Sequence, residues 1–510
     1  MNLRREIILF IVLNFIIRIV FWALPAELTD GNYIPDDTYL SLAIAENIAS
    51  GKGPLYTDSY TNGFQPLYVF LTAPVYFFTT DKVTALKIAQ LMLIFFDCAS
   101  LLIILLLLKK NTTSIYIIRI AAVIWLLSNY PLMMGLNGLE TMISAFFILF
   151  IIYYTHKIRF FDPEPGSGGR YIFLGLLFGL AIFTRIDNTL LAFAFFLLTV
   201  WKLLKGRLKL SAEIRKYLIT TISAIIIYLP WMIYSYHYTE SIFPVSGKAV
   251  RMLSISVLEN FGHEITGWLF FLYRSMIVAA KYSFVIWLLI LGCIIYYRRN
   301  KDTISLPPVI KAALIYCVLM FCAYTFYIPA YWFFPRYFFP FFPILLISGL
   351  FLLGRIFNNS SLRFQKYAFT LVLIAVPAYT FIYGETHNLI SGKNIKGYLP
   401  VGKFVDNYFE PGTIIGAPQS GGINYFADSL LVYNLDGVVN PDVFRALKDS
   451  TVFEYIERKK IEYILDWDFN IDYIAKRGGD SSLIELREVD VGNIPKTYKF
   501  DWRIYRVIYK

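Results

Sequence analysis

The chain has 510 residues, of which 57% are hydrophobic and 18% aromatic, and its mean hydropathy is +0.57. This composition excludes a string of soluble domains and predicts a polytopic α-helical membrane protein. The net charge of +11 does not indicate a nucleic-acid partner, because most Lys and Arg lie in short loops between apolar runs and no nucleic-acid motif is present.

Long apolar runs separated by basic loops set the predicted topology. The run 7–24 follows a basic N-terminal segment, which predicts a first span that begins inside the cell. Further spans are expected near residues 85–108, 116–135, 141–156, 171–184, 188–204, 217–236, 282–297, 309–328, 337–354 and 367–384. With about eleven spans, the basic loops face the cytoplasm under the positive-inside rule and the C-terminus lies outside. We therefore expect a multi-pass protein of the cell inner (plasma) membrane.

Two apolar runs, 66–78 and 269–280, are shorter than a bilayer span. We expect both to lie at the membrane interface, or, for the first, to re-enter the membrane.

The composition changes after the last predicted span. Residues 385–510 are charged and punctuated by Gly, Asn and Asp, which predicts a soluble extracytoplasmic domain of ordinary size. Strands are expected near 413–416, 430–434 and 461–465, with one helix over 442–460. Strand, helix and strand in this order favour a small α/β domain. The chain therefore divides into a transmembrane domain, 1–384, and an α/β domain, 385–510.

Two adjacent carboxylates, Asp36 and Asp37, follow Pro35 in the loop after the first span. Pro35 suits the start of a helix, and either aspartate can cap the free N–H groups there. Capping needs one carboxylate, and the second is repelled by the first unless a cation or a substrate proton lies between them. The pair is therefore a candidate for general-base catalysis, with Asp36 the first choice, or for binding a divalent cation such as Mg or Mn. The alternative is that both are helix caps only.

Basic residues on the predicted outer side are candidates for binding an anionic group. They are Arg185, Lys248, Arg251 and Arg336. Arginine binds phosphate bidentately, although a basic side chain at a helix end can also snorkel to the lipid headgroups. Glu140 is a candidate for orienting an acceptor hydroxyl, or is a plain first-turn acid of its helix.

Several short motifs, taken in order, resemble the GT-C glycosyltransferases that use polyprenyl-phosphate sugars. The nearest likeness is to terminal arabinofuranosyltransferases and related bacterial transferases, including mannosyltransferase-like proteins. The motifs are Asp36-Asp37-Thr38-Tyr39, Gly51-Lys52-Gly53, Tyr60-Thr61-Asn62, Gly138-Leu139-Glu140, Arg185-Ile186-Asp187 and Arg336-Tyr337.

The resemblance implies an inverting-type transfer of a hexosyl or pentosyl group from a polyprenyl-phosphate donor to an extracytoplasmic glycan or lipid acceptor. Such a reaction needs a carboxylate to take the acceptor proton and cations to stabilise the leaving phosphate. Asp36 and Asp37 match the first role, and the four basic residues match the second. The resemblance also implies substrate-binding residues, namely Tyr39, Asn62, Gln65, Glu140 and Asp187.

Two other functions fit parts of the sequence. A transporter or flippase of lipid-linked sugar would concentrate charge near the middle of its spans, whereas most charged candidates here lie at one predicted face. A glycan-binding assembly subunit would use only the outer domain. The three functions are separated by one observation, which is whether the two aspartates share a cavity with Arg185 and Arg336.

Overall fold

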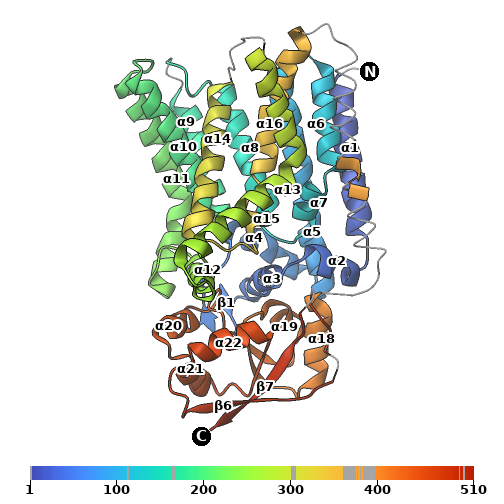
Figure 1. Ribbon diagram of the computed structural model, residues 1–510, viewed down its shortest axis with the longest axis vertical. Helices are drawn as coiled ribbons and strands as arrows, with labels where there is room; N and C mark the ends of the chain where they lie inside the picture. The colour runs from blue at the N-terminus through green and yellow to red at the C-terminus, as the bar shows by residue number, and fades with distance from the viewer. Residues whose placement is uncertain are drawn as a thin grey trace.

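The computed structural model describes residues 3–111, 114–163, 167–299, 306–359, 397–492, 494–497 and 500–510, together with 375, 377–379, 381 and 382. A helical bundle forms one end of the molecule and an α/β domain the other, with short helices between them (Figure 1). The N-terminus lies at the end of the bundle away from the α/β domain. This arrangement agrees with the fold class expected from the sequence.

The helices of the bundle are built from the predicted apolar runs. They are α1 (Leu3–Trp22), α5 (Lys82–Asn111), α6 (Ile115–Leu127), α7 (Asn129–Leu136), α8 (Thr141–Lys157), α9 (Gly168–Thr184), α10 (Thr189–Leu204), α11 (Leu210–Thr239), α13 (Glu264–Arg299), α14 (Pro308–Cys322) and α16 (Phe341–Asn359). The other helices that precede the α/β domain are α2 (Ala26–Tyr33), α3 (Asp36–Ala49), α4 (Pro66–Thr72), α12 (Val245–Ser256) and α15 (Phe334–Tyr337), with single turns η1 (Ala73–Phe77), η2 (Ile186–Asn188), η3 (Val257–Asn260) and η4 (Ala323–Tyr327).

The outer faces of the bundle are apolar. On α11, Ile222, Ile226 and Ile233 are exposed at helical spacing, which is the pattern of a face that meets lipid. Within the described residues, five helices are long and apolar enough to cross a membrane, or up to seven if each bent pair is one span. The count of about eleven spans stays a prediction, and its last span, 367–384, lies almost wholly outside the described residues.

Both predicted short runs are helical. Residues 66–77 form α4 and η1, which lie beside α3 and not across the bundle. The run 269–280 and the next predicted span form two helices that meet at a kink and together carry the label α13, so the interfacial position of the run stays a prediction. Ser283, with non-helical φ and ψ of −120° and 16°, bends this helix where the sequence predicted a boundary.

A buried ion pair lies inside the bundle, beside the junction between α6 and α7. Arg18 Nε donates to Asp97 Oδ2 at 2.7 Å, and both side chains are fully buried. The remaining nitrogens of Arg18 donate to the carbonyls of Leu126 and Trp125 at 3.2 and 3.4 Å, while the Trp125 indole donates to Asp97 Oδ1 at 2.7 Å. Arg18 thus satisfies the free carbonyls of the last turn of α6, which a helix end in lipid requires.

The α/β domain is built on a five-stranded sheet of order β4-β3-β5-β7-β6. Its strands are β3 (Ile414–Ala417), β4 (Leu431–Asn434), β5 (Tyr463–Asp466), β6 (Ile484–Glu488) and β7 (Arg503–Tyr509), and a two-stranded hairpin, β1 (Leu55–Tyr56) and β2 (Ser59–Tyr60), belongs to the first outer loop. The strands β4, β3 and β5 are parallel, and β7 and β6 add to them antiparallel. The helices are α18 (Tyr398–Tyr408), α19 (Gly421–Phe426), α20 (Pro441–Asp449), α21 (Val452–Lys459) and α22 (Asp468–Lys476).

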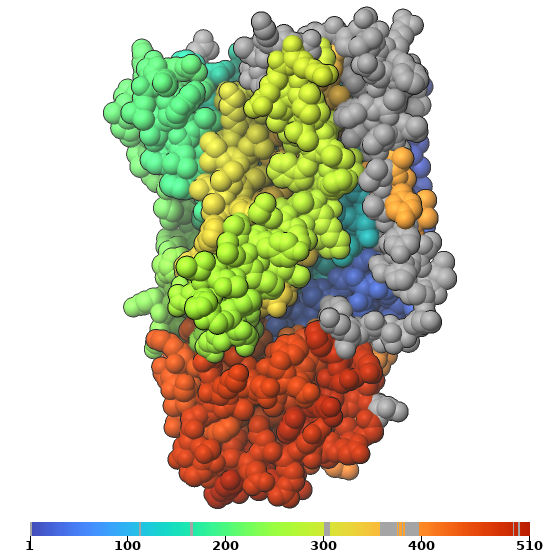
Figure 2. Space-filling model, in the orientation of Figure 1, coloured from blue at the N-terminus to red at the C-terminus, as the bar shows by residue number. Residues whose placement is uncertain are grey.

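The expected single helix over 442–460 is wrong. Ser450 adopts a left-handed conformation that ends α20, and α21 starts again two residues later. The α/β domain packs directly on the bundle end, against the α12–α13 segment (Figure 2). One continuous apolar core runs from the bundle through α3 to β3 and α19, so the two parts are joined by buried contact.

Candidate active site

A cavity of about 670 Å³ lies where the bundle, the first outer loop and the α/β domain meet. Its wall includes α3, the tip between α9 and α10, α12 and the segment around α15, as well as residues of the α/β domain. Among the charged residues that line it are Asp37, Glu140, Arg185, Asp187, Lys248, Arg251, Arg336 and Arg477. Carboxylates and cations therefore converge on one cavity at one end of the bundle.

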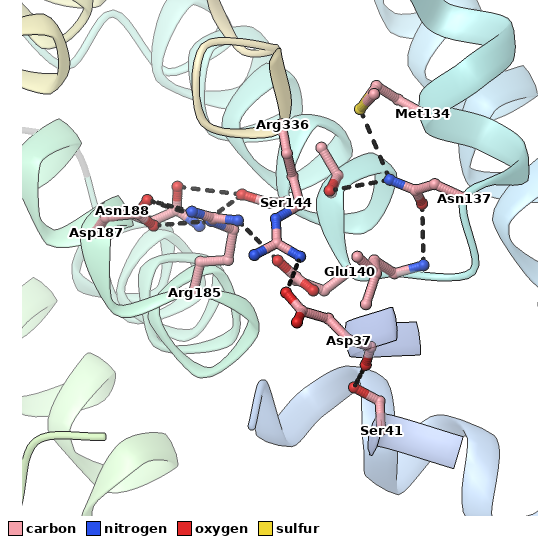
Figure 3. A network of polar contacts seen from close by, with 12 residues as sticks. Asp37, Ser41, Met134, Asn137, Glu140, Ser144, Arg185, Asp187, Asn188 and Arg336 are labelled. Carbon is pink, nitrogen blue, oxygen red and sulfur yellow. Dashed lines mark hydrogen bonds and ion pairs between the residues drawn. The ribbon is translucent and has the colours of Figure 1, made fainter. Parts of the chain in front are cut away.

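Asp37 and Arg336 form the central pair of this cavity. Arg336 Nη1 donates to Asp37 Oδ2 at 2.7 Å, and the two side chains point towards one another (Figure 3). Each keeps some exposure to the cavity, 25% for Asp37 and 14% for Arg336. The guanidinium stacks over Phe333 and Tyr337, and its Nε is buried without a partner among the described residues. Arg336 thus has one N–H group left without an acceptor in the described chain, beside a carboxylate.

Asp36 does not line the cavity. It is 5% exposed, and its two oxygens accept the backbone N–H groups of Gly421 and Gly422 at 2.9 and 2.8 Å. Burial raises the pKa of Asp36 well above its usual range, although these two hydrogen bonds act in the opposite direction. A base must reach the proton that it takes, so this position does not suit the base role that the sequence favoured for Asp36.

Arg185 is held by carboxylates. Its Nη1 donates to Glu140 Oε1 at 2.7 Å, and its Nη2 and Nε donate to Asp187 at 2.8 and 3.1 Å (Figure 3). From η4, the Tyr324 hydroxyl accepts from Arg185 and donates to Asp187. The network fixes the α9–α10 tip against neighbouring helices, and most of the guanidinium hydrogens are used within it.

The two basic residues of α12 that line the cavity make fewer hydrogen bonds than Arg185. Lys248 donates to Ser241 Oγ at 2.7 Å, and Arg251 Nε donates to the Tyr327 carbonyl at 3.2 Å. Neither forms an ion pair with a residue in the described ranges. Because they stand three residues apart on a helix, both face the same side, and both line the cavity.

The substrate-binding residues expected from the resemblance fall into two groups. Gln65, Glu140 and Asp187 line the cavity. Tyr39 does not, because it is fully buried and donates to Asp30 Oδ1 at 2.5 Å. Asn62 is also buried, and it binds the chain before α12 through the carbonyls of residues 241 and 243 and the amide of residue 245. Tyr39 and Asn62 are thus held by hydrogen bonds within the protein and do not line the cavity, and their substrate-binding role stays a prediction.

The donor set does not fit the expected divalent cation. Asp36 turns towards Gly421 and Gly422 while Asp37 turns towards Arg336, so the two carboxylates do not converge. Over the parts of the chain that the structure describes, no group of three or more His, Cys, Asp or Glu could hold a metal ion. Divalent cations of this kind prefer several oxygen ligands on one ion.

Two residues that line the cavity, Tyr324 and Arg477, lie in no sequence pattern that would predict their position there. Tyr324 is one of many aromatic residues in an apolar run, and only the fold brings it to Asp187. Arg477 follows α22 in the α/β domain, lines the cavity, and lies 3.8 Å from Glu259 of η3. Both positions depend on contacts between segments far apart in the chain.

The bundle, the outer loop helices and the α/β domain together have the fold of solved membrane-protein structures that match this chain over 98% of its length. The chain superposes on ArnT from Cupriavidus metallidurans with a TM-score of 0.60 and 12% identity over 98% of both chains. With the same protein bound to undecaprenyl phosphate, the TM-score is 0.60 at 13% identity, covering 98% of this chain and 97% of that one.

A second similar structure is the Archaeoglobus fulgidus oligosaccharyltransferase tethered to an acceptor peptide. Its TM-score is 0.56 at 14% identity, covering 98% of this chain and 74% of that one. No protein-family model matches the sequence, and a search of curated proteins finds no match. The likeness therefore defines the fold, and the site must define the function.

Proposed function

We propose that this protein is a membrane glycosyltransferase that moves a sugar from a polyprenyl-phosphate donor to a glycan or lipid acceptor. The observation that carries the proposal is the Asp37–Arg336 pair, which places a carboxylate and a partly free guanidinium in one cavity at the bundle end. The solved structures with this fold support it, since one of them binds undecaprenyl phosphate. The cavity and the α/β domain are proposed to lie on the extracytoplasmic side.

The base role passes from Asp36 to Asp37. Asp37 accepts the proton of the acceptor hydroxyl, and the acceptor oxygen forms a bond to the anomeric carbon of the sugar. The bond from that carbon to the phosphate oxygen breaks, and its electron pair leaves with the polyprenyl phosphate. One displacement of this kind inverts the anomeric configuration.

Arg336 is proposed to bind the leaving phosphate, with Lys248 and Arg251 adding positive charge from α12. The phosphate gains charge as the glycosidic bond breaks, and fixed cations in a site sheltered from water stabilise that charge. Arg185 is assigned a supporting role, because Glu140 and Asp187 already hold it. No step requires a metal ion.

A transporter of lipid-linked sugar is less well supported. The ion pair that lies inside the described part of the bundle, Arg18 with Asp97, is fully buried and also bonded to backbone carbonyls. Neither residue lines the cavity.

The test is sugar transfer by the purified protein in nanodiscs, with a panel of radiolabelled polyprenyl-phosphate sugars. With the active donor, Asp37→Asn should lower kcat by about a hundred- to ten-thousandfold, the usual effect of losing a general base. Asp58→Asn is the matched control, because Asp58 is an exposed carboxylate of the same loop that does not line the cavity. Parent activity in a folded Asp37→Asn protein would refute the proposal.

A further inference from the structure

Three consecutive residues at the start of α3 contact three different parts of the molecule. Asp36 accepts from Gly421 and Gly422 of the α/β domain, and Asp37 accepts from Arg336 in the cavity. Thr38 donates to the carbonyl of Asn137, at 2.7 Å, in the loop that leads to Glu140. The first turn of α3 therefore joins the α/β domain, the cavity and the bundle.

The contact of Asp36 is closely fitted. A Cβ on Gly421 would lie 2.3 Å from the Asp36 carbonyl oxygen, so only glycine permits this approach. The loop that carries Gly421 is also held from the far side, since Asp466 Oδ2 accepts the N–H of Gln419 at 2.6 Å. Asp36 forms no ion pair with a described residue, and both of its oxygens are directed at this loop.

The α/β domain supplies part of the cavity wall. Val438, Val439, Phe444 and Arg477 line the cavity from that side. A Cβ on Gly63, which lines the cavity from the first outer loop, would lie 1.9 Å from the Val438 carbonyl oxygen, so the two parts of the wall are in direct contact. The shape of the cavity therefore depends on how the α/β domain docks.

We propose that Asp36 is a positioning residue that docks the α/β domain through Gly421 and Gly422, and that this docking completes the cavity beside Asp37. The inference rests on the proposed function, because it assigns Asp36 a part in the same reaction. Asp36 acts through the domain that it holds and does not exchange a proton with the substrate.

A docking role and a base role predict different kinetics. When the competent state is only partly populated, apparent affinity falls by that fraction, and saturating substrate restores the state. Loss of docking therefore raises KM more than it lowers kcat, whereas loss of a base lowers kcat at any substrate concentration. The hydrogen bonds of a charged group change such an equilibrium by about ten- to a hundredfold.

The experiment compares the parent full chain in nanodiscs with Asp36→Asn, Gly421→Ala and Asp58→Asn. Asn keeps one acceptor oxygen but turns an N–H₂ group towards the amides, and Gly421→Ala forces the same contact apart without changing Asp36. Asp58→Asn is the control, because Asp58 is a more exposed carboxylate of the same interface, which accepts from Lys459 at 2.6 Å and from Tyr433 at 2.9 Å. Hydrogen exchange is measured on peptides covering 418–426, together with kcat, KM and the melting temperature.

We expect exchange at Gly421 and Gly422 to rise by about tenfold or more in both test variants. KM should rise by a similar factor while kcat stays within about threefold of the parent. The control should stay close to the parent in hydrogen exchange, kcat, KM and melting temperature. A fall of kcat by a hundredfold with parent exchange would make Asp36 chemical and overturn the inference. Parent kinetics would also overturn it, whether or not exchange rises.

A binding measurement separates this inference from the proposed function. Undecaprenyl phosphate is titrated against the parent and both test variants, and weaker binding by about tenfold in both variants is expected. This arm needs no sugar transfer, so a parent protein that transfers nothing would refute the proposed function alone. Equal binding by parent and variants would refute the docking role.

Discussion

Replacing Arg336 by lysine tests the cavity most directly, because the structure shows what that change keeps and what it removes. Lysine keeps the positive charge and one donor for Asp37, which accepts from Arg336 Nη1 at 2.7 Å. It removes the planar fork, including the buried Nε that has no partner in the described chain, and the stacking on Phe333 and Tyr337. Lysine binds phosphate as a point charge, so bidentate contact is lost.

The expected cost is that of one hydrogen bond between charged groups, about 1.5–3 kcal/mol. Since 1.4 kcal/mol corresponds to a tenfold change, kcat/KM should fall by about ten- to 150-fold in Arg336→Lys. Arg336→Ala should lose more, because it also removes the charge and leaves Asp37 without its partner. Both variants are assayed for transfer from the radiolabelled polyprenyl-phosphate sugar that the parent uses.

Arg274→Lys is the matched control for this series. Arg274 also has a buried Nε without a partner in the described residues and stacks over an aromatic ring, that of Tyr331, but it does not line the cavity. Its kcat/KM should stay within about threefold of the parent. Full activity in both Arg336 variants, or an equal loss in Arg274→Lys, would refute the phosphate-binding role.

Further predictions concern stability and topology. Glu140→Gln should lower the melting temperature by loosening Arg185, at a cost of about 1.5–3 kcal/mol, and an unchanged melting temperature would show that the pair does not hold the α9–α10 tip. Burial raises the pKa of Asp30, which faces Tyr39 and Glu27, to about 7, whereas an unfolded aspartate titrates near pH 4. Its contribution is therefore full below about pH 4 and is lost as the pH rises through about 7, so parent stability should fall over this range more than that of Asp30→Asn. Equal pH profiles would exclude this linkage. A reporter fused after residue 205 should be cytoplasmic and one fused after residue 510 external; an internal C-terminus would refute the topology.

The sequence was sufficient to locate the candidate site, but it did not show which of the two aspartates faces the cavity. Pro35 and the two aspartates mark a helix start after the first span, and α3 does begin at Asp36. Which carboxylate faces the cavity depends on the docking of Gly421, which is 385 residues away in the chain. Local patterns carry no information on such a contact, and this is why the sequence could not show that Asp37, and not Asp36, lines the cavity.

The α/β domain shows the same limit. The buried parallel strands β3, β4 and β5 are short apolar runs, and the sequence predicted all three. The antiparallel strands β6 and β7 alternate with charged residues and have exposed positions, so their hydrophobic pattern is weak. The division of residues 442–460 into two helices depends on the left-handed conformation of Ser450. A glycine at this position would have indicated a helix end in the sequence, but the residue is a serine.

The ion pair between α1 and α5 has a consequence for how the chain enters the membrane. Asp97 lies in the middle of α5, and an unpaired charge at the centre of a span costs about 2.5–3.5 kcal/mol on insertion scales. Each of the two helices carries a buried charge that pairs with the charge of the other. The first helix is therefore expected to remain close to the translocation machinery until the second arrives, so that the two leave for the lipid as a neutral pair. The order of synthesis suits this, since no other long apolar helix is described between them.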